Sequence, residues 1–246
     1  MPIPLIFHRI WLGGPMPEEF RAYGESWLKY HPGATMQLWG DDNLPLIRNR
    51  DLFDAAPTYA SKSDILRYEL LWQFGGVYID TDFECVQSIQ GLLVGVEDFA
   101  AHEFSMGARM AIGVLGSVGK SPLFAALIEG LPASIAEHGH ADPPTSTGPG
   151  YFTRSVDAFC ARGGIAPTIF PASYFYPYSW REPHRRFEKF PEAYAVHHWA
   201  HSWGTPSGSR LQRLLRRGLM RTSLTRRVLY IEAWLSRRSS PPTSMT

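Results

Sequence analysis

In the segment Gly75-Gly76-Val77-Tyr78-Ile79-Asp80-Thr81-Asp82, two glycines precede a short apolar run that ends in two aspartates. The residues before it, 61–74, have the apolar periodicity of a helix, with Ser61 or Ser63 as the N-cap and Asp64 in the first turn. Glycine readily adopts the left-handed conformation of a helix C-cap, so the glycine pair ends this helix. The pattern predicts a helix, a tight turn and a buried strand that carries the first aspartate at its carboxyl end.

The flanking segments extend this pattern to an α/β fold. Residues 5–12 and 36–39 are predicted strands, and residues 17–30 between them are a predicted helix. Further along, 110–115 reads as a strand and 122–138 as a helix. The alternation of strands and helices is typical of a mostly parallel sheet covered by helices. Ligands bind such sheets outside the carboxyl ends of the strands, where the aspartates are expected.

Length and composition favour one α/β domain over residues 1–206, followed by a tail at 207–246. No window of the chain approaches the roughly 20 apolar residues needed to span a bilayer. The first residues carry no basic segment, so we expect no signal peptide. The two cysteines, Cys85 and Cys160, are too few for a disulfide scaffold, and we expect a cytoplasmic protein.

The tail concentrates positive charge. Residues 207–246 contain nine Arg, no Lys and one Glu, which gives +8; since the whole chain is +1, the remainder carries −7. Leucines 211, 214, 215 and 219 fall on one helical face, so we expect a basic amphipathic helix as a C-terminal addition to the fold. Such a helix suits a peripheral position on an anionic membrane surface. No nucleic-acid motif accompanies it, and we expect no nucleic-acid partner.

Two carboxylates separated by one residue at a strand end are well placed to bind a hard divalent cation. Mg²⁺ or Mn²⁺ usually takes one or two protein carboxylates and completes its shell with water and phosphate oxygens. Asp80 and Asp82 are therefore candidate ligands of a metal that stabilises a leaving diphosphate.

The longer sequence context is more specific than the acidic pair. Ser63-Asp64-Ile65-Leu66-Arg67-Tyr68, followed by the glycine pair and D-x-D, closely resembles the sugar-binding region of Och1-like mannosyltransferases and capsular-polysaccharide glycosyltransferases (glycosyltransferase family 32-like). The catalytic domains of the large clostridial glucosylating toxins share it. The opening at residues 7–14, Thr147-Gly148-Pro149 and residues 197–203 are also similar. The resemblance spans about residues 3–203.

This resemblance implies a GT-A-like (Rossmann-like) nucleotide-sugar-binding fold and roles for individual residues. Trp11 would stack on the nucleotide base, and His8 belongs to the same donor-binding segment. Asp64 and Arg67, three apart on one helical face, would bind donor sugar hydroxyls and a phosphate oxygen. Tyr78 would contact the diphosphate.

The remaining implied roles complete the metal and donor site. Asp80 would touch ribose, sugar and metal, and Asp82 would be the direct metal ligand. In the C-terminal cluster, Ser202 would lie near the metal, Trp203 would donate to phosphate, and His198 would join the metal shell. The catalytic candidates are thus Asp64, Arg67, Asp80 and Asp82.

The function implied is a metal-dependent hexosyltransferase that retains anomeric configuration. A UDP-sugar donor is favoured by the toxin-like context of Trp11, and GDP-mannose stays open. The acceptor would be a glycan or a lipid-linked sugar in surface polysaccharide (capsule) synthesis. The sequence departs from the family at Met110-Ala111-Ile112, where an Asn is expected, and at Lys120-Ser121-Pro122, where Gly-His-Pro is common.

Parts of the sequence also resemble four other kinds of protein. A non-catalytic sugar-nucleotide-binding protein stays open, although such a protein would more plausibly have lost one of the four candidate residues. A D-x-D phosphatase usually has Thr or Val where this chain has Glu84. Residues 114–121 nearly form a P-loop but have Val114 in place of its first glycine. Histidines near 138–140 and 197–201 make a poor structural zinc set without cysteines.

Overall fold

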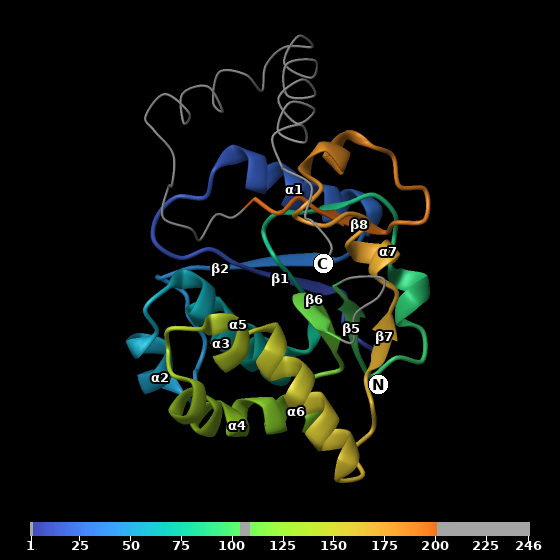
Figure 1. The fold of residues 1–246 in the computed structure, drawn as a ribbon. Helices are drawn as coiled ribbons and strands as arrows, with labels where there is room; N and C mark the ends of the chain where they lie inside the picture. The colour runs from blue at the N-terminus through green and yellow to red at the C-terminus, as the bar shows by residue number, and fades with distance from the viewer. Residues whose placement is uncertain (1, 104–108, 201–246) are drawn as a thin grey trace, which may run out of the picture.

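The computed structural model describes residues 2–103 and 109–200, which form a six-stranded sheet between two layers of helices and loops (Figure 1). The strands of this sheet are β1 (Ile6–Ile10), β2 (Thr35–Trp39), β3 (Gly76–Ile79), β5 (Asp98–His102), β6 (Met110–Ser117) and β7 (Thr168–Phe170). Their spatial order is β2-β1-β3-β6-β5-β7. The pairs β1–β2, β1–β3 and β5–β7 are parallel, while β6 runs antiparallel to β3 and β5. The prediction of an α/β fold with a mostly parallel sheet is confirmed.

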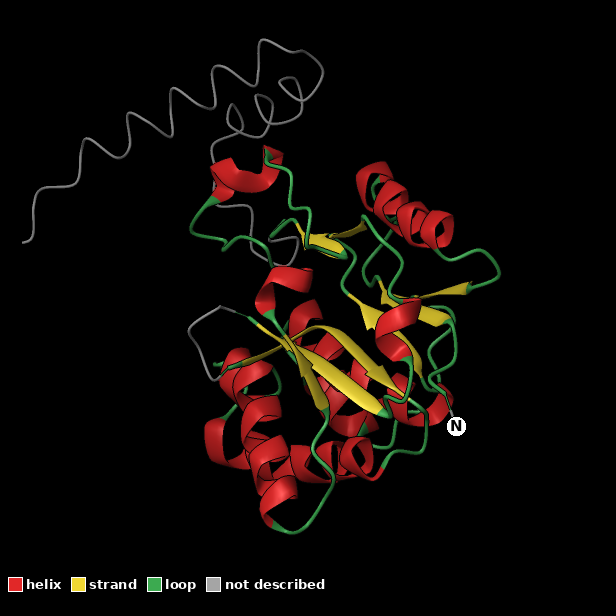
Figure 2. Ribbon diagram, turned by 90° about the vertical axis from the view of Figure 1, so that its right-hand side faces the viewer, coloured by secondary structure: helices red, strands yellow, loops and turns green. Residues whose placement is uncertain are grey.

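The helices lie on both sides of this sheet. They are α1 (Glu18–Tyr30), α2 (Arg50–Ala55), α3 (Tyr59–Phe74), α4 (Pro122–His138), α5 (Pro143–Ser146), α6 (Pro149–Ala161) and α7 (Ala172–Phe175), with 3₁₀ turns η1 (Gln90–Leu93) and η2 (Pro183–Phe187). Figures 1 and 2 show α3, α4 and α6 on one side and α1 on the other. A second, two-stranded sheet of β4 (Phe83–Cys85) and β8 (Ala195–His197) lies on the α1 side.

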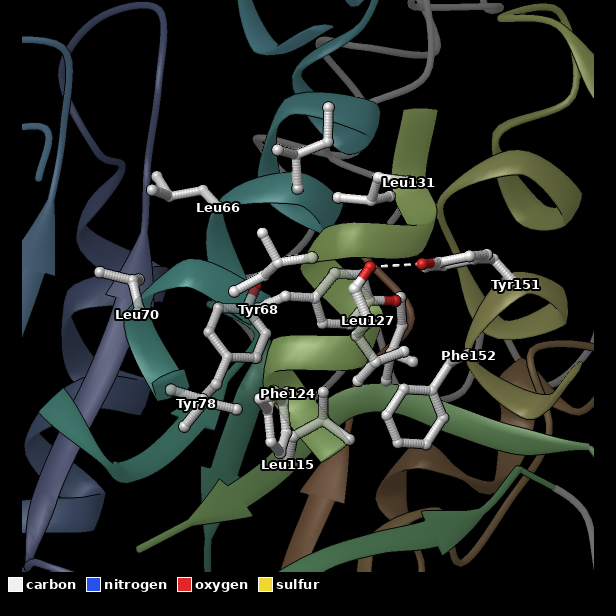
Figure 3. Close-up of a cluster of buried hydrophobic side chains, with 14 of the residues drawn as sticks. Leu66, Tyr68, Leu70, Tyr78, Leu115, Phe124, Leu127, Leu131, Tyr151 and Phe152 are labelled. Atoms are coloured by element: carbon white, nitrogen blue, oxygen red, sulfur yellow. Dashed lines mark hydrogen bonds between the residues drawn. The ribbon is translucent and has the colours of Figure 1, made fainter. Parts of the chain in front are cut away.

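Each side of the sheet has its own apolar core. On the α3 side, Tyr68 and Leu70 pack with Phe124 and Phe152 from α4 and α6 (Figure 3). Tyr151 of α6 donates a hydrogen bond from its hydroxyl to a backbone carbonyl of α4 in the same cluster. Burial of apolar area contributes about 25 cal/mol per Å², so this packing is the main stabilisation of the face.

The opposite core forms around α1. Trp27 is fully buried there, its ring lies 5.0 Å from that of Phe7, and its indole Nε1 donates to the carbonyl of Phe83 at 3.1 Å. This bond connects α1 to the strand that follows Asp80-Thr81-Asp82, which we call the acidic turn. Buried tryptophans usually find a partner for their N–H, and this partner also positions β4.

Helix α3 and the turn after it follow the predicted pattern, with an earlier start. The hydroxyl of Thr58 caps the helix by accepting from the amide of Ser61 at 3.1 Å, so Ser61 and Ser63 are not its caps. The helix therefore begins at Tyr59, and Asp64 lies beyond the first turn. Ten of its 16 residues are buried, as expected of a central helix covered on most sides.

The glycine pair is required by the path of the chain. Gly75 ends α3 with a φ of 65°, and Gly76 opens β3 with a φ of 92°. A Cβ on Gly76 would overlap the carbonyl oxygen of Ile6 in the neighbouring strand. Only glycine combines this backbone conformation with so close an approach. All four residues of β3 are buried, which matches the short apolar run seen in the sequence.

The directions of the strands bring one end of each of four strands to the same edge of the sheet. The parallel strands β1 and β3 end there, and so does β5, while the antiparallel β6 begins there. Ile79 of β3 pairs with Val114, and the amide of Asp80 continues this ladder with a 2.8 Å bond to the carbonyl of Gly113. The acidic turn thus projects from the sheet beside the first residues of β6.

The other expected elements are largely present. The helix predicted at 122–138 is confirmed with these bounds, and the one predicted from 17 to 30 runs from Glu18 to Tyr30. The segment between α4 and α6 contains the short helix α5. Strands β4, β5, β7 and β8 were not predicted. The expected amphipathic tail, 207–246, lies outside the described residues, among which no helix is long and apolar enough to cross a bilayer.

Candidate functional site

An arginine of β1 binds the backbone of the acidic turn. Arg9 is buried, and its Nη2 donates to the carbonyl of Thr81 at 2.6 Å and to that of Phe20 at 2.5 Å. One guanidinium therefore fixes the middle of Asp80-Thr81-Asp82 and the start of α1 together. The sequence analysis missed this positioning residue, since an arginine within an apolar strand gives no sign of its partner.

Asp82 is bound by residues from the end of the described chain. Its Oδ1 lies 3.1 Å from Nε2 of His197, and its Oδ2 accepts from the amide of Ala200 at 2.8 Å. Burial by itself would raise the pKa of Asp82, but the His197 charge and these hydrogen bonds lower it to about 2. Burial opposes the charged form of His197 too, and Asp82 raises the pKa of its imidazole. The two side chains form a charged pair.

Asp80 lies in a more exposed but still crowded position. Its Oδ1 accepts from the Tyr78 hydroxyl at 2.6 Å and lies 3.4 Å from Nη1 of Arg67. Burial raises the pKa of Asp80, Arg67 opposes this, and the charge of Asp82 raises the pKa further. Two carboxylates are thus brought together at the strand end despite their repulsion, which a bound cation would relieve.

Three side chains fit a metal site. Asp80, Asp82 and His197 each offer one ligand atom within 4.8 Å of the others, and they are the only group of its kind among residues 2–103 and 109–200. Carboxylate oxygens with one imidazole nitrogen suit Mn²⁺, and a shell completed by water suits Mg²⁺. The donor set therefore fits the divalent cation that the sequence analysis expected.

The histidine of this group differs from the one expected. His198 was predicted for the metal shell, but its Nε2 lies 2.9 Å from Oε2 of Glu84, and its ring stacks on Tyr23 at 4.6 Å. His197 takes the place beside the carboxylates because β8 pairs with β4, with His197 directly opposite Phe83. Side chains alternate along a strand, so the neighbouring residue turns to the other side.

Asp64 and Arg67 lie together, as their spacing predicted. Nη2 of Arg67 lies 3.0 Å from Oδ1 of Asp64, whose Oδ2 accepts from the Thr147 hydroxyl at 2.9 Å. Arg67 also donates to the carbonyls of Ser63 at 3.2 Å and Ile112 at 2.7 Å. Burial raises the pKa of Asp64 to about 6, against the opposing effects of Arg67 and Thr147. These two residues are bound mainly to the protein itself.

Tyr78 and Trp11 occupy different surroundings. Tyr78 is 1% exposed, its ring lies 4.5 Å from the Arg67 guanidinium, and its hydroxyl is bound to Asp80. It therefore supports the carboxylate from within the core. Trp11 follows β1 at the site edge, is half-buried, and has its ring 5.1 Å from that of Phe20. Its predicted stacking on a base stays a prediction, and Ser202 and Trp203 lie outside the described residues.

His8 is a structural residue in this fold. It is 1% exposed; Trp39 donates from Nε1 to its Nδ1 at 3.1 Å, and its Nε2 lies 2.8 Å from the Gly75 carbonyl. An indole N–H can only donate, so Nδ1 accepts and Nε2 carries the proton that binds Gly75. Both ring nitrogens are used within the protein. The predicted contact with the donor is therefore replaced by support of the glycine turn.

Comparison with known proteins gives the family context of this site. Residues 17–103 match a family model described as "Glycosyltransferase sugar-binding region containing DXD motif". An uncharacterized glycosyltransferase of Acanthamoeba polyphaga mimivirus is 28% identical over 64% of this chain and 66% of its own length. Inositol phosphoceramide mannosyltransferase 2 of Schizosaccharomyces pombe is 31% identical over 52% of this chain and 38% of its own. The chain thus spans less than two thirds of these relatives.

The fold is shared with a solved glycosyltransferase. The UDP-bound glycosyltransferase domain of the YGT toxin superposes with a TM-score of 0.55, over 100% of this chain and 92% of that one, at 10% identity. The predicted GT-A-like fold and the resemblance to D-x-D glycosyltransferases are confirmed. The matched segment, 17–103, includes α3, β3 and the acidic turn.

The buried His8 predicts a pH dependence of stability. Burial lowers the pKa of His8 to about 4, against an unfolded value near 6.5. Between these pH values the unfolded chain binds a proton that the folded protein excludes, so stability falls as the pH is lowered through this range. Titration of His8 would lower the free energy of unfolding by up to about 3 kcal/mol between neutral pH and pH below 4.

Urea unfolding of the wild type and His8→Gln at pH 7 and pH 5 measures this effect. Glutamine keeps a donor for Gly75 but does not titrate, so we expect a smaller loss of stability between the two pH values in the variant. Equal losses in both proteins would refute the role of His8. His31, whose pKa burial also lowers, accounts for part of the loss that remains.

Proposed function

We propose, starting from the match of residues 17–103 to D-x-D glycosyltransferases, that this protein is a metal-dependent glycosyltransferase with a nucleotide-sugar donor. The observation that carries the proposal is the meeting of Asp80, Asp82 and His197 at the carboxyl edge of the sheet, next to the buried Arg67. This edge is where α/β folds bind ligands.

Asp80, Asp82 and His197 would hold Mn²⁺ or Mg²⁺. The bound cation would supply positive charge that stabilises the leaving diphosphate. The protein's part is to keep the two carboxylates in place: Arg9 fixes the turn between them, and the amide of Ala200 binds Asp82. The charge of His197 keeps Asp82 ionised until a metal binds, when His197 would give up its proton and act as a neutral ligand. Arg67, bound on several sides, is fixed in position to stabilise further negative charge at the same edge.

We propose transfer with retention, as the resemblance implies. The oxygen of the acceptor hydroxyl bonds to the anomeric carbon on the face from which the diphosphate departs, and the bond from that carbon to the phosphate oxygen breaks. The hydroxyl proton passes to the departing diphosphate. This route needs no covalent nucleophile from the protein, and Asp80 is held by Tyr78 and Arg67 in a role of binding and orientation.

The donor is proposed to be a UDP-hexose, with GDP-mannose as the other candidate. The UDP-bound state of the YGT toxin domain, which shares the fold, supports the first. The word mannosyltransferase in the name of the Schizosaccharomyces pombe relative supports a mannose donor. Trp11, at the end of β1, is the proposed stacking surface for the base.

The acceptor is proposed to be a glycan or a lipid-linked sugar in surface polysaccharide synthesis such as that of a capsule. The inositol phosphoceramide named for the Schizosaccharomyces pombe relative is a lipid acceptor and supports the lipid-linked choice. A cytoplasmic enzyme at the inner face of a membrane suits this role, with residues 207–246 as the basic contact.

Calorimetry with UDP and GDP, each with and without Mn²⁺, tests the donor site. We expect one nucleotide to bind in a metal-dependent manner, and Asp82→Asn to weaken that binding at least about tenfold, because changes even around metal ligands cost about 10–100-fold. Asp98→Asn is the matched control, since it alters a buried carboxylate that accepts from Ser121 at the far end of β5. If neither nucleotide binds, the transferase proposal fails, and the phosphatase and non-catalytic alternatives gain.

Product analysis tests catalysis and its stereochemistry. With the nucleotide-sugar identified, wild type should transfer the sugar to water or to an added acceptor, and proton NMR of the first product should show the donor's anomeric configuration. An inverted product would contradict the front-face route. Binding of the donor with no transfer to any acceptor or to water would favour the non-catalytic sugar-nucleotide-binding alternative.

Sedimentation with lipid vesicles tests the role of the tail. The full chain should bind vesicles that contain anionic phosphatidylserine, less so at high salt, and deletion of 207–246 should abolish this binding, because about 1 kcal/mol per basic residue is lost. Neutral phosphatidylcholine vesicles are the control. Unchanged partitioning of the truncated protein would contradict the membrane proposal.

A further inference from the structure

Two buried polar atoms beside the carboxylates have no partner among the described residues. Nδ1 of His197 makes no hydrogen bond although the residue is only 8% exposed, and Oε2 of Glu103 is equally without one. A buried polar group left without a partner costs about 1–3 kcal/mol. Such groups call for an explanation, and a ligand that supplies the missing hydrogen bonds is one.

The strand geometry brings Glu103 to the acidic turn. Glu103 directly follows β5, and its amide donates to the carbonyl of Arg109 at 3.2 Å, which extends the pairing of β5 with β6. Side chains two residues apart on a strand share a face, so Glu103 points to the same side as Ala101. Ala101 packs in the core cluster that also contains Phe83 and Tyr176, on the side where His197 lies.

Electrostatic effects agree with this placement. The carboxylate of Glu103 raises the pKa of both His197 and Tyr176, as expected of a negative charge on their side of the sheet. The ring of Tyr176 lies 5.4 Å from that of His197. Tyr176 and His197 thus lie together on the side of the sheet that Glu103 faces.

Gly113 of β6 lets Asp80 and Tyr176 lie close to the strand. A Cβ on Gly113 would lie 2.8 Å from Oδ2 of Asp80 and 3.0 Å from the hydroxyl of Tyr176. Real Cβ atoms essentially never lie within 3.0 Å of a heavy atom from elsewhere in the fold, so only glycine at position 113 lets Asp80 pack this closely against β6.

Asp64 and Arg67, which the sequence predicted to bind the sugar and a phosphate oxygen, have few hydrogen-bonding positions left for a ligand. Both oxygens of Asp64 already accept, from Arg67 and Thr147, and Arg67 donates to two carbonyls and two carboxylates. The free capacity for hydrogen bonds lies instead at Glu103, where one carboxylate oxygen is unused. A ligand gains most where it satisfies groups that are otherwise unpaired.

We infer that Glu103, on the same side of the sheet as Tyr176 and His197, forms a subsite for a hydroxyl group of the sugar that is transferred, with Glu103 accepting the hydrogen bond. The inference rests on the proposed function. Glu103 would then be a specificity residue, which distinguishes donors by the hydroxyl that they present at this position. A hydroxyl bound to a charged carboxylate contributes about 1.5–3 kcal/mol, or roughly 10–100-fold in affinity.

Calorimetry of nucleotide against nucleotide-sugar separates this subsite from the metal and diphosphate site. The probes are UDP and GDP, then UDP-glucose, UDP-galactose, UDP-N-acetylglucosamine and GDP-mannose, all with Mn²⁺. For Glu103→Gln we expect nucleotide affinity within about twofold of wild type, and nucleotide-sugar affinity at least about tenfold weaker. Glu103→Ala should behave alike, and Asp98→Asn, a buried carboxylate at the other end of β5, should change neither affinity.

Thermal unfolding supplies a second readout. The buried Oε2 of Glu103 has no hydrogen-bond partner among the described residues, so Glu103→Gln should be at least as stable as wild type. A lower midpoint would indicate a structural role and overturn the inference, as would equal loss, or no loss, of nucleotide and nucleotide-sugar affinity. If wild type binds neither UDP nor GDP, the proposed function itself has failed and the subsite falls with it.

Discussion

The buried guanidinium of Arg67 joins the parts of the molecule that form the site. It bonds to its own helix at Ser63, to β6 at Ile112, and to the carboxylates of Asp64 and Asp80. Charges are costly to bury unless they are paired and hydrogen-bonded, so this arrangement is stable only with α3, β3 and β6 in their present register. The planar fork of arginine serves several acceptors at once, whereas lysine would offer one nitrogen.

The acidic turn depends on a second set of constraints, from both ends of the described chain. Arg9 holds the carbonyl of Thr81 from β1, and His197 and Ala200 hold the carboxylate of Asp82 from the region of β8. Consequently the candidate metal ligands Asp80, Asp82 and His197 come from segments that are distant in sequence but meet at one edge of the sheet. Residues held on rigid elements in this way need little rearrangement when a ligand binds, which lowers the cost of binding.

The polar groups of the site fall into two sets, one with hydrogen-bond partners within the protein and one with atoms that lack such partners. On the α3 side, Asp64 and Arg67 satisfy each other and their neighbours. On the α1 side, Glu103 and His197 each keep one polar atom without a hydrogen-bond partner among the described residues. The first set stabilises the fold and fixes charge, and the second leaves the capacity that recognition requires. Natural proteins often place such destabilising groups where they bind their ligands.

The local sequence determined the helix, glycine turn and strand that end in Asp80, because helical periodicity and the φ of Gly75 act over a few residues. It likewise placed the aspartates at the carboxyl edge of an α/β sheet. Only the tertiary structure decided that His197 and not its neighbour joins them, since the pairing of β4 with β8 joins residues over a hundred positions apart. Glu103 was invisible for the same reason: its environment is made by other strands, and no local pattern records which polar atoms will be left unpaired.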